Sequence, residues 1–382
     1  GHEAMGSGVA TSGYNVAIGK ESAKSATSMS ESIAIGYQSA EQNTTGSNII
    51  AIGYTAYDAA DTENHNLAIG TSALGGAVAG GESNVAIGNY SLDALTSADA
   101  CVAVGYQSGS AITTGANNVL MGYNVGASIT TGANNTFFGH QAGDGFDAED
   151  HNLGIGVNAL GGSIAGGEFN VAIGNLAGDA ITTGDNNTLV GHEAGGALSG
   201  SNSNTFVGYH CGVGASNACH TNTAMGYKAG EELTTGDNNL LLGASAGDPN
   251  SPGGQIDSDN NQIVLGNHDI TNAHIQVDWT VASDKRDKTD VEAVAIGLDF
   301  VNKLEPVTYR WDKRADYSGD LSVTPTGEHK ADWLDIGFLA QDVVELEKQF
   351  GFDVDNKTNL TTDVNKYGTH YGIQYSKFVP IL

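Results

Sequence analysis

The chain has 382 residues, 54 of them glycine and 5 proline, and 44 acidic residues outnumber 15 basic ones for a formal net charge of -29. This excess excludes a nucleic-acid-binding surface, which needs clustered lysine and arginine. No apolar run approaches the roughly 20 residues that cross a bilayer, so we expect no membrane insertion. The 3 cysteines have no metal-ligand spacing and predict buried thiols, not a disulfide framework or zinc site.

The chain begins partway through a repeat. Its first four residues, Gly-His-Glu-Ala, recur at 191–194, and Gly1 lies one repeat before Gly19. A natural start would carry a capping element over the exposed edge. We therefore expect residues 1–382 to be part of a longer polypeptide. A second, longer similarity relates 65–89 to 151–175, an offset of five repeats that indicates duplication.

A glycine that ends a short apolar segment returns every 17 or 18 residues over the first two-thirds of the chain. A fixed short period of this kind predicts a mainly β protein, a parallel β-solenoid (β-roll) rod with one coil per repeat. The glycines are Gly19, Gly36, Gly53, Gly70, Gly88, Gly105, Gly122, Gly139, Gly156, Gly174, Gly191, Gly208, Gly226 and Gly243, with Gly266 after an insertion.

The apolar segments predict self-association. The residues one and three before each glycine are mostly Val, Ile or Leu, and the residue between them is alanine in eight coils and a larger apolar residue in others. A strand that is apolar on both faces needs both faces covered. One face can fill the coil, and the other needs other copies of the chain around an axis. The sequence therefore predicts a homotrimer, without indicating which face points to its axis.

The remainder of each coil has the composition of turns. The segment Thr-Thr-Gly-Ala-Asn-Asn at 113–118 recurs at 130–135 and, with Asp for Ala, at 182–187 and 234–239. Glycine and asparagine tolerate positive φ. Asparagines stacked in successive coils can also form hydrogen-bonded ladders.

The strand repeat resembles the head repeats of trimeric autotransporter adhesins. Asn-Val-Ala-Ile-Gly at 15–19 and 84–88 carries that pattern, and the resemblance covers roughly residues 1–247. It implies a left-handed parallel β-roll within a trimer, although the coils here are longer than those of the adhesins. Similar repeats occur in phage tail fibres, so the motif specifies the architecture better than the kind of protein.

We expect three domains: a rod at 1–247, a neck with the last coil at 248–282, and a different α/β domain at 283–382. Pro and Gly at 249–254 interrupt the coils. The Asp-rich stretch 248–269 lacks a spaced ligand loop and is expected to be a solvated linker, not a calcium site. The 11 histidines are expected on the surface or in turns, and no metal or cofactor is predicted.

The composition changes near residue 283. Residues 1–282 hold 3 basic and 26 acidic residues, whereas 283–382 hold 12 and 18. Three blocks follow: Ser-Asp-Lys-Arg-Asp-Lys at 283–288, Leu-Glu-Pro-Val-Thr-Tyr-Arg-Trp at 304–311, and Ile-Gly-Phe-Leu-Ala-Gln-Asp-Val at 336–343.

These blocks resemble the endosialidase-type intramolecular chaperone domain of phage tail spikes and fibres. The resemblance implies that three chaperone domains align three chains for folding. It also implies that a Ser–Lys pair, Ser283 with Lys288, then cuts the chain after Ala282. The family usually continues past the equivalent of 375–380 into a long helix that forms a trimeric coiled coil, whereas this sequence stops at Leu382. An uncleaved chaperone is therefore an open alternative.

The residues also make chemical sense without the resemblance. A serine hydroxyl becomes a nucleophile when a base removes its proton, and a partly desolvated lysine can do so. Ser283 and Lys288 are five positions apart, so a turn or short helix could join their side chains for attack on the carbonyl of Ala282. The alternative is that Ser283 and Asp284 only cap a helix that ends in solvated lysines.

These patterns predict the shaft and host-attachment part of a trimeric phage tail fibre or spike, folded in the host cytoplasm and located in the virion tail. Its partners are its own copies and a cell-surface receptor, a glycan or an outer-membrane component. Self-cleavage is the only enzymatic activity expected. The alternatives are a bacterial trimeric surface adhesin, or a polysaccharide-degrading tailspike whose enzyme domain lies upstream.

Overall fold

The computed structural model describes residues 2–6, 13–162, 165–276, 281–294, 296–317 and 321–381. The chain divides into two compact units, Gly1–Ala246 with Ile256–Ile263, and Gly247–Gln255 with Val264–Leu382. Residues of the expected neck, 248–282, occur in both units, and 277–280 lie outside the described ranges, as do Gly1 and Leu382. Within those ranges no helix has the length and apolar character needed to span a bilayer.

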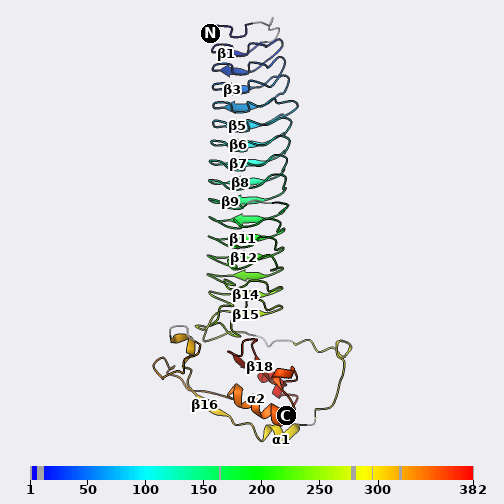
Figure 1. Cartoon of the computed structure of the whole chain (residues 1–382), viewed down its shortest axis with the longest axis vertical. Coiled ribbons are helices and arrows are strands. Elements are labelled where there is room, and N and C mark those ends of the chain that lie inside the picture. The colour runs from blue at the N-terminus through cyan, green and yellow to red at the C-terminus, as the bar shows by residue number, and fades with distance from the viewer. Residues whose placement is uncertain are drawn as a thin grey trace. The chain divides into compact units, whose positions relative to one another are not determined.

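Fifteen strands of three residues form one sheet in the described part of the chain, each hydrogen-bonded to the next in sequence order (Figure 1). Neighbouring strands pair parallel and in register, so that Ala86 lies opposite Ala103. The predicted parallel β-solenoid of 17–18-residue coils is confirmed. The strands are β1 (Val16–Ile18), β2 (Ile33–Ile35), β3 (Ile50–Ile52), β4 (Leu67–Ile69), β5 (Val85–Ile87), β6 (Val102–Val104), β7 (Val119–Met121), β8 (Thr136–Phe138), β9 (Leu153–Ile155), β10 (Val171–Ile173), β11 (Thr188–Val190), β12 (Thr205–Val207), β13 (Thr223–Met225), β14 (Leu240–Leu242) and β15 (Ile263–Leu265).

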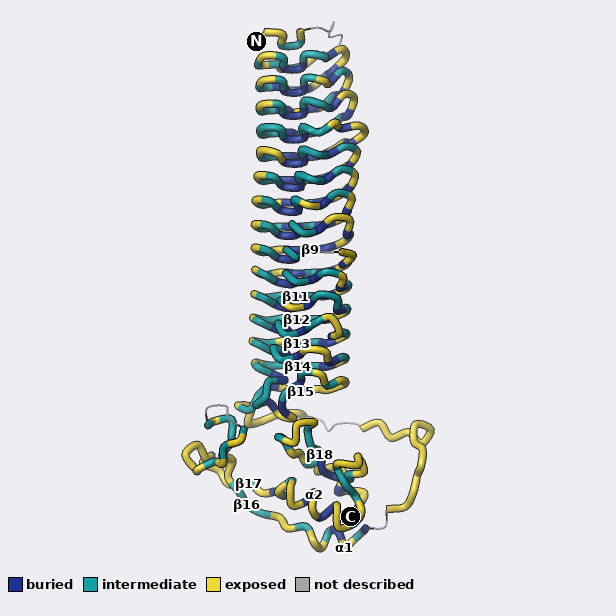
Figure 2. The backbone as a smooth tube through the Cα atoms, in the orientation of Figure 1, coloured by how far each residue is buried: buried dark blue, intermediate teal, exposed yellow. Residues whose placement is uncertain are grey.

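The middle residue of each strand fills the inside of its coil. Side chains alternate between the two faces of a strand, and from β2 onward the middle residue is buried, as the dark segments repeated along the solenoid show (Figure 2). Ala86 and Phe137 are both 0% exposed. The flanking residues point outward and remain partly accessible, with Ile18 at 57% and Met225 at 48%. The alanine face is therefore internal, and the Val/Ile face is the one left open.

The close stacking of the coils requires the glycine that ends each strand. At Gly105 φ is 138°, and a Cβ there would lie 2.0 Å from the carbonyl oxygen of Gly122 in the next coil. Gly36 has the same relation to Gly53, also at 2.0 Å. A side chain would collide with backbone, in a conformation that L-residues rarely adopt, so only glycine fits. The collision explains why this residue sets the repeat.

A ladder of asparagine side chains runs inside the solenoid, one residue before most of the strands. The Oδ1 of Asn187 accepts a hydrogen bond from the backbone N–H of Asn204 at 3.0 Å, and its Nδ2 donates to the carbonyl of Ser201 at 2.8 Å. The side chains thus satisfy buried backbone groups of the following coil. The asparagines that repeat this pattern are Asn15, Asn66, Asn84, Asn118, Asn135, Asn152, Asn170, Asn187, Asn204, Asn222 and Asn239.

The second unit is smaller and mixed α/β. Strand β16 pairs antiparallel with β17, and β18 with β19. Its core contains Ile296, Phe300, Val343, Leu346 and Phe378. The elements are η1 (Lys285–Asp287), α1 (Gly297–Val301), β16 (Val307–Tyr309), η2 (Arg314–Asp316), β17 (Asp335–Gly337), α2 (Ala340–Gln349), η3 (Val354–Asn356), β18 (Thr362–Val364), β19 (Tyr371–Ile373) and η4 (Tyr375–Phe378).

A buried carboxylate ties helix α2 to strand β18. Glu347 is 1% exposed. It accepts hydrogen bonds from the backbone N–H and the hydroxyl of Thr361 at 2.6 and 2.7 Å, and from the hydroxyl of Thr362 at 2.7 Å. Because these donors replace water around the carboxylate, the buried charge is compatible with a stable core.

Candidate functional site

The side chains of Ser283 and Lys288 meet across one short turn. The Nζ of Lys288 donates a hydrogen bond to the Oγ of Ser283 at 2.5 Å. Between them lies η1, a 3-10 helix of three residues. A turn of this length reverses the chain enough for two side chains five positions apart to touch. The contact is the one that the five-residue spacing of Ser283 and Lys288 predicts.

Asp284 caps this turn. Its carboxylate accepts a hydrogen bond from the backbone N–H of Arg286 at 2.9 Å and forms an ion pair with the Arg286 guanidinium at 2.6 Å. These hydrogen bonds to Arg286 hold the pKa of the Asp284 carboxyl below its ordinary value. The N-terminal cap that the alternative interpretation expects is therefore present, and the cap residue is Asp284. The contact between Ser283 and Lys288 is present as well, because these two side chains meet across the same turn.

The pair is open to solvent in the single chain. Ala282, Ser283 and Lys288 are exposed, as are all the described residues of 281–294. A lysine acts as a base only in its neutral form, which burial away from water favours. The two side chains are therefore in contact in one chain, while both remain open to water.

The two downstream blocks lie side by side. Block 304–311 contains β16 and block 336–343 begins in β17, and these two strands pair. The indole Nε1 of Trp311 donates to the Asp335 carboxylate at 3.2 Å, and its ring packs edge-on against Tyr309 with centroids 5.3 Å apart. The phenol oxygen of Tyr375 accepts a hydrogen bond from the backbone N–H of Phe338 at 3.2 Å. The motif residues thus gather around one small sheet.

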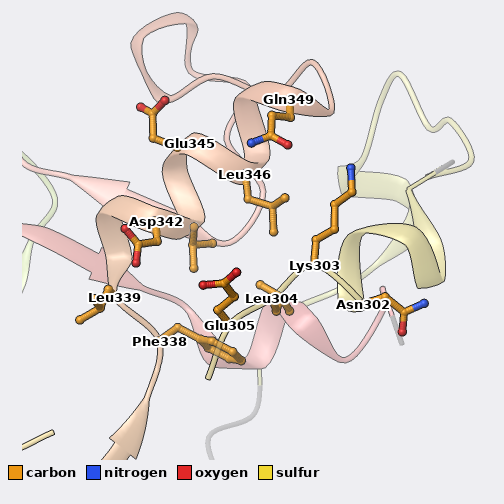
Figure 3. Close-up of a pocket in the computed structure, with 11 residues that line it drawn as sticks. Asn302, Lys303, Leu304, Glu305, Phe338, Leu339, Asp342, Glu345, Leu346 and Gln349 are labelled. Atoms are coloured by element: carbon orange, nitrogen blue, oxygen red, sulfur yellow. The ribbon is translucent and has the colours of Figure 1, made fainter. Parts of the chain in front are cut away.

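An open groove lies between helix α2 and the segment after α1 (Figure 3). Leu304, Phe338 and Leu346 give it an apolar floor, and Glu305 and Asp342 are among its charged residues. The described residues that line it include no serine, cysteine or histidine, and none of them belongs to the Ser–Lys pair.

One group of side chains was missed at the level of sequence. The histidines are expected on the surface or in turns, and His192 and His210 do lie in turns. The spacing does not indicate that these two histidines lie one coil apart in the rod, both close to Glu193. The repeat length could have indicated this group, because residues 18 positions apart, such as His192 and His210, lie in adjacent coils.

Residues 283–352 match the family model described as chaperone of endosialidase. The match begins at Ser283 and includes both downstream blocks. No curated protein matches the chain significantly.

Proposed function

We propose that this chain is the shaft and host-attachment part of a homotrimeric phage tail fibre or tail spike, carried in the virion tail. In this proposal its C-terminal domain, 283–382, aligns three chains and is then released by self-cleavage. The observation that carries the proposal is the match to the endosialidase chaperone at 283–352, directly downstream of a β-solenoid. The receptor is a glycan or an outer-membrane component of the host surface.

The open face of the solenoid supports a trimer. The outward residues of the strands are mostly apolar and partly exposed in one chain, with Ile50, Ile155 and Ile173 each at 37%. Threonine takes the first outward position in β8, β11, β12 and β13. Together the outward residues form a largely apolar surface that follows the sheet from coil to coil. Because soluble monomers rarely expose apolar surface on this scale, we infer that other copies cover it.

The second unit supports association independently. Leu298 is 68% exposed, Leu334 62% and Ile336 71%, although all three are large apolar side chains. The groove beside α2 adds an accessible apolar floor. A domain of this kind gains stability when copies of it pack together, which is what an assembly-directing chaperone requires.

The proposed cleavage starts from the contact seen in the turn. Neutral Lys288 accepts the proton of the Ser283 hydroxyl while Oγ attacks the carbonyl carbon of Ala282. The C–N bond then breaks, and the former amide nitrogen of Ser283 takes up a proton and becomes a free amine. Ala282 is now held to Oγ by an ester. Water hydrolyses the ester, which leaves a carboxylate on Ala282 and restores the hydroxyl of Ser283.

Assembly would supply the missing desolvation. Packing of copies against the exposed segment 281–294 would remove water from Lys288 and favour its neutral form. Cleavage would then follow trimerisation, which prevents a lone chain from discarding its chaperone before the three rods are aligned.

The test is intact-mass spectrometry of the protein produced from its complete reading frame, with native mass measured in parallel. We expect a new N-terminus at Ser283 in the wild type, folded and uncut trimers for Ser283→Ala, and severely slowed cutting for Lys288→Ala. Lys285→Ala, in the same exposed turn, is the matched control and should cut normally. A wild-type trimer that stays intact for days would show that the domain is retained and the Ser–Lys assignment wrong.

A further inference from the structure

Two adjacent coils of the rod bring together three side chains that can bind a metal. His192 and Glu193 follow β11 and its glycine, and His210 follows β12. One ligand atom from each lies within 4.8 Å of the other two. The closest pair is His210 Nε2 and Glu193 Oε2, at 2.8 Å. Among the residues that the structure describes, this is the group of three histidine, cysteine, aspartate or glutamate residues whose ligand atoms all lie within 4.8 Å of one another.

The stacking of the coils, and not a loose loop, fixes these positions. The backbone N–H of Glu193 donates to the carbonyl of Asn175 at 3.0 Å, and that of His210 donates to the carbonyl of His192 at 3.0 Å. The ring of Tyr209 stacks on His210, with centroids 4.0 Å apart, and on His192, at 5.5 Å. A site on such a regular scaffold loses little freedom when an ion binds.

The surroundings favour a cation. Glu231 lies 3.8 Å from His210 Nδ1, and Lys228, the nearby cation, is paired with Glu231 at 2.9 Å. The carboxyl of Asp179 is near enough to Glu193 to interact with it electrostatically. Among the residues that the structure describes, no lysine forms an ion pair with Glu193 or Asp179, and the chain has a net charge of -29. The local field therefore attracts positive ions.

We propose that His192, Glu193 and His210 bind one divalent transition-metal ion of the zinc class. Two imidazole nitrogens and one carboxylate oxygen form a ligand set that suits Zn²⁺. Three protein ligands leave a fourth position of the tetrahedron for water. All three side chains are partly accessible, with relative exposures of 43%, 32% and 22%, so the ion can enter from solvent. Bound there, it joins two successive coils through side chains.

The chain contains its own comparison site. His2 and Glu3 repeat the His192–Glu193 dipeptide, and the N–H of Glu21 donates to the carbonyl of His2 at 3.0 Å, the same backbone contact that His210 makes to His192. At this first site, however, Glu21 stands where His210 stands in the other. It therefore has the same backbone arrangement but only one histidine.

The test uses the full chain, purified without a histidine tag and stripped of metal, then titrated with Zn²⁺ in a calorimeter. We expect one ion per chain. Loss of a residue that only supports a metal ligand can lower the affinity for the metal by roughly 10-fold, and loss of a ligand itself should lower it at least as much. We therefore expect His210→Gln and Glu193→Gln to bind Zn²⁺ at least about tenfold more weakly than the wild type. His2→Gln, which changes the comparison site, should bind like the wild type.

Substitution by Co²⁺ gives an independent readout, because tetrahedral Co²⁺ absorbs visible light strongly and the octahedral aqueous ion does so weakly. The wild type and His2→Gln should show the absorption, and His210→Gln should not. Equal circular dichroism spectra of all variants would exclude misfolding as the cause. The proposal is overturned if the wild type binds no Zn²⁺ at millimolar concentration, or if His210→Gln and His2→Gln bind it like the wild type.

Discussion

At the scale of single residues, the inside of the solenoid is filled by side chains of matched size. Phe137 occupies the position that alanine holds in many coils, and glycine lies beside it at two places. A Cβ on Gly143 would lie 2.4 Å from the Phe137 ring, and one on Gly154 would lie 2.8 Å from it. The large ring is accommodated because these neighbours have no side chain. Close packing of this kind leaves no room for a new group.

We predict that Ala86→Asp destabilises the rod by several kcal/mol per chain. Ala86 is 0% exposed, and a carboxylate at this position would be buried without a partner. Thermal unfolding followed by circular dichroism measures the effect. Ala100→Asp places the same charge at an exposed position of the next turn and should unfold close to the wild type. Equal melting temperatures for the two variants would contradict the internal position of the alanine face.

The pair Ser283–Lys288 shows how far single residues can be predicted. The spacing and the two downstream blocks were enough to predict a contact between the two side chains. The exposure of the pair was not predictable, because it depends on what packs over residues 281–294. The proximity of His192 and His210 was not predictable from the repeat alone. His192 is the first residue after the glycine of its coil, and His210 is the second residue after the glycine of the next coil. Only the stacking of the coils in the structure shows that these two positions lie side by side.

At the scale of the coil, the asparagine ladder links most coils to the next one. We predict that Asn187→Ala lowers the stability of the rod by about 2 kcal/mol or more, because each buried group left without a partner costs about 1–3 kcal/mol. The groups affected are the N–H of Asn204 and the carbonyl of Ser201. Chemical denaturation measures the change in unfolding free energy.

The neighbouring residue provides the control for that substitution. Asn186 is exposed and has φ 59°, so Asn186→Gly keeps a residue that tolerates this conformation while it removes an amide. It should change stability by a few tenths of a kcal/mol, since surface substitutions usually stay within about 0.5 kcal/mol. If both substitutions have the same effect, the ladder contributes nothing of its own.

The coil is also the element that the sequence predicts best. The strand-ending glycine and the apolar residues before it define each strand to the residue, because the same collision with the next coil recurs at the strand-ending glycines from Gly19 to Gly226. Which face of the strand is internal could not be predicted, since alanine and Val/Ile are both apolar. The short elements of the second unit, such as β18 and β19, carry no period, and their positions depend on contacts distant in sequence, such as those of Glu347.

At the scale of the whole molecule, we expect a mildly acidic pH to stabilise the folded protein. Burial raises the pKa of Asp58, Asp93, Asp144 and Asp179, which lie five residues after a strand-ending glycine. In the folded state they bind protons more readily than in the unfolded chain, where the pKa is 3.8. Their contribution to stability is therefore fully present below 3.8 and is lost as the pH rises through the folded values.

We predict a higher melting temperature at about pH 4.5 than at pH 7. Protonation also reduces the self-repulsion of a chain with net charge -29. Asp93→Asn should raise the melting temperature at pH 7 and reduce the difference between the two pH values. A melting temperature that decreases steadily on acidification would contradict the burial of these carboxylates.

We predict a native mass of three times the 39.1 kDa chain by light scattering. Charges on the open face should prevent association, because they would be buried between copies. The double variant Ile173→Glu and Met225→Glu tests this, since both residues are on that face and 37% and 48% exposed. Ser97→Glu, at an exposed turn position, is its control. A stable, soluble wild-type monomer would rule out the trimer.

The similarity between 65–89 and 151–175 has a consequence for the evolution of the rod. The N–H of His65 donates to Ser47, and that of His151 donates to Ala133, so the two points occupy the same place in their coils. Glu63 and Glu149 likewise both accept a hydrogen bond from a glycine N–H 17 residues further on. Recombination between the two stretches would remove or add five whole coils, about 24 Å of rod, and would keep the backbone register of the coils at the junction. Descendants could thus differ in reach while the pattern of backbone hydrogen bonds continues from coil to coil.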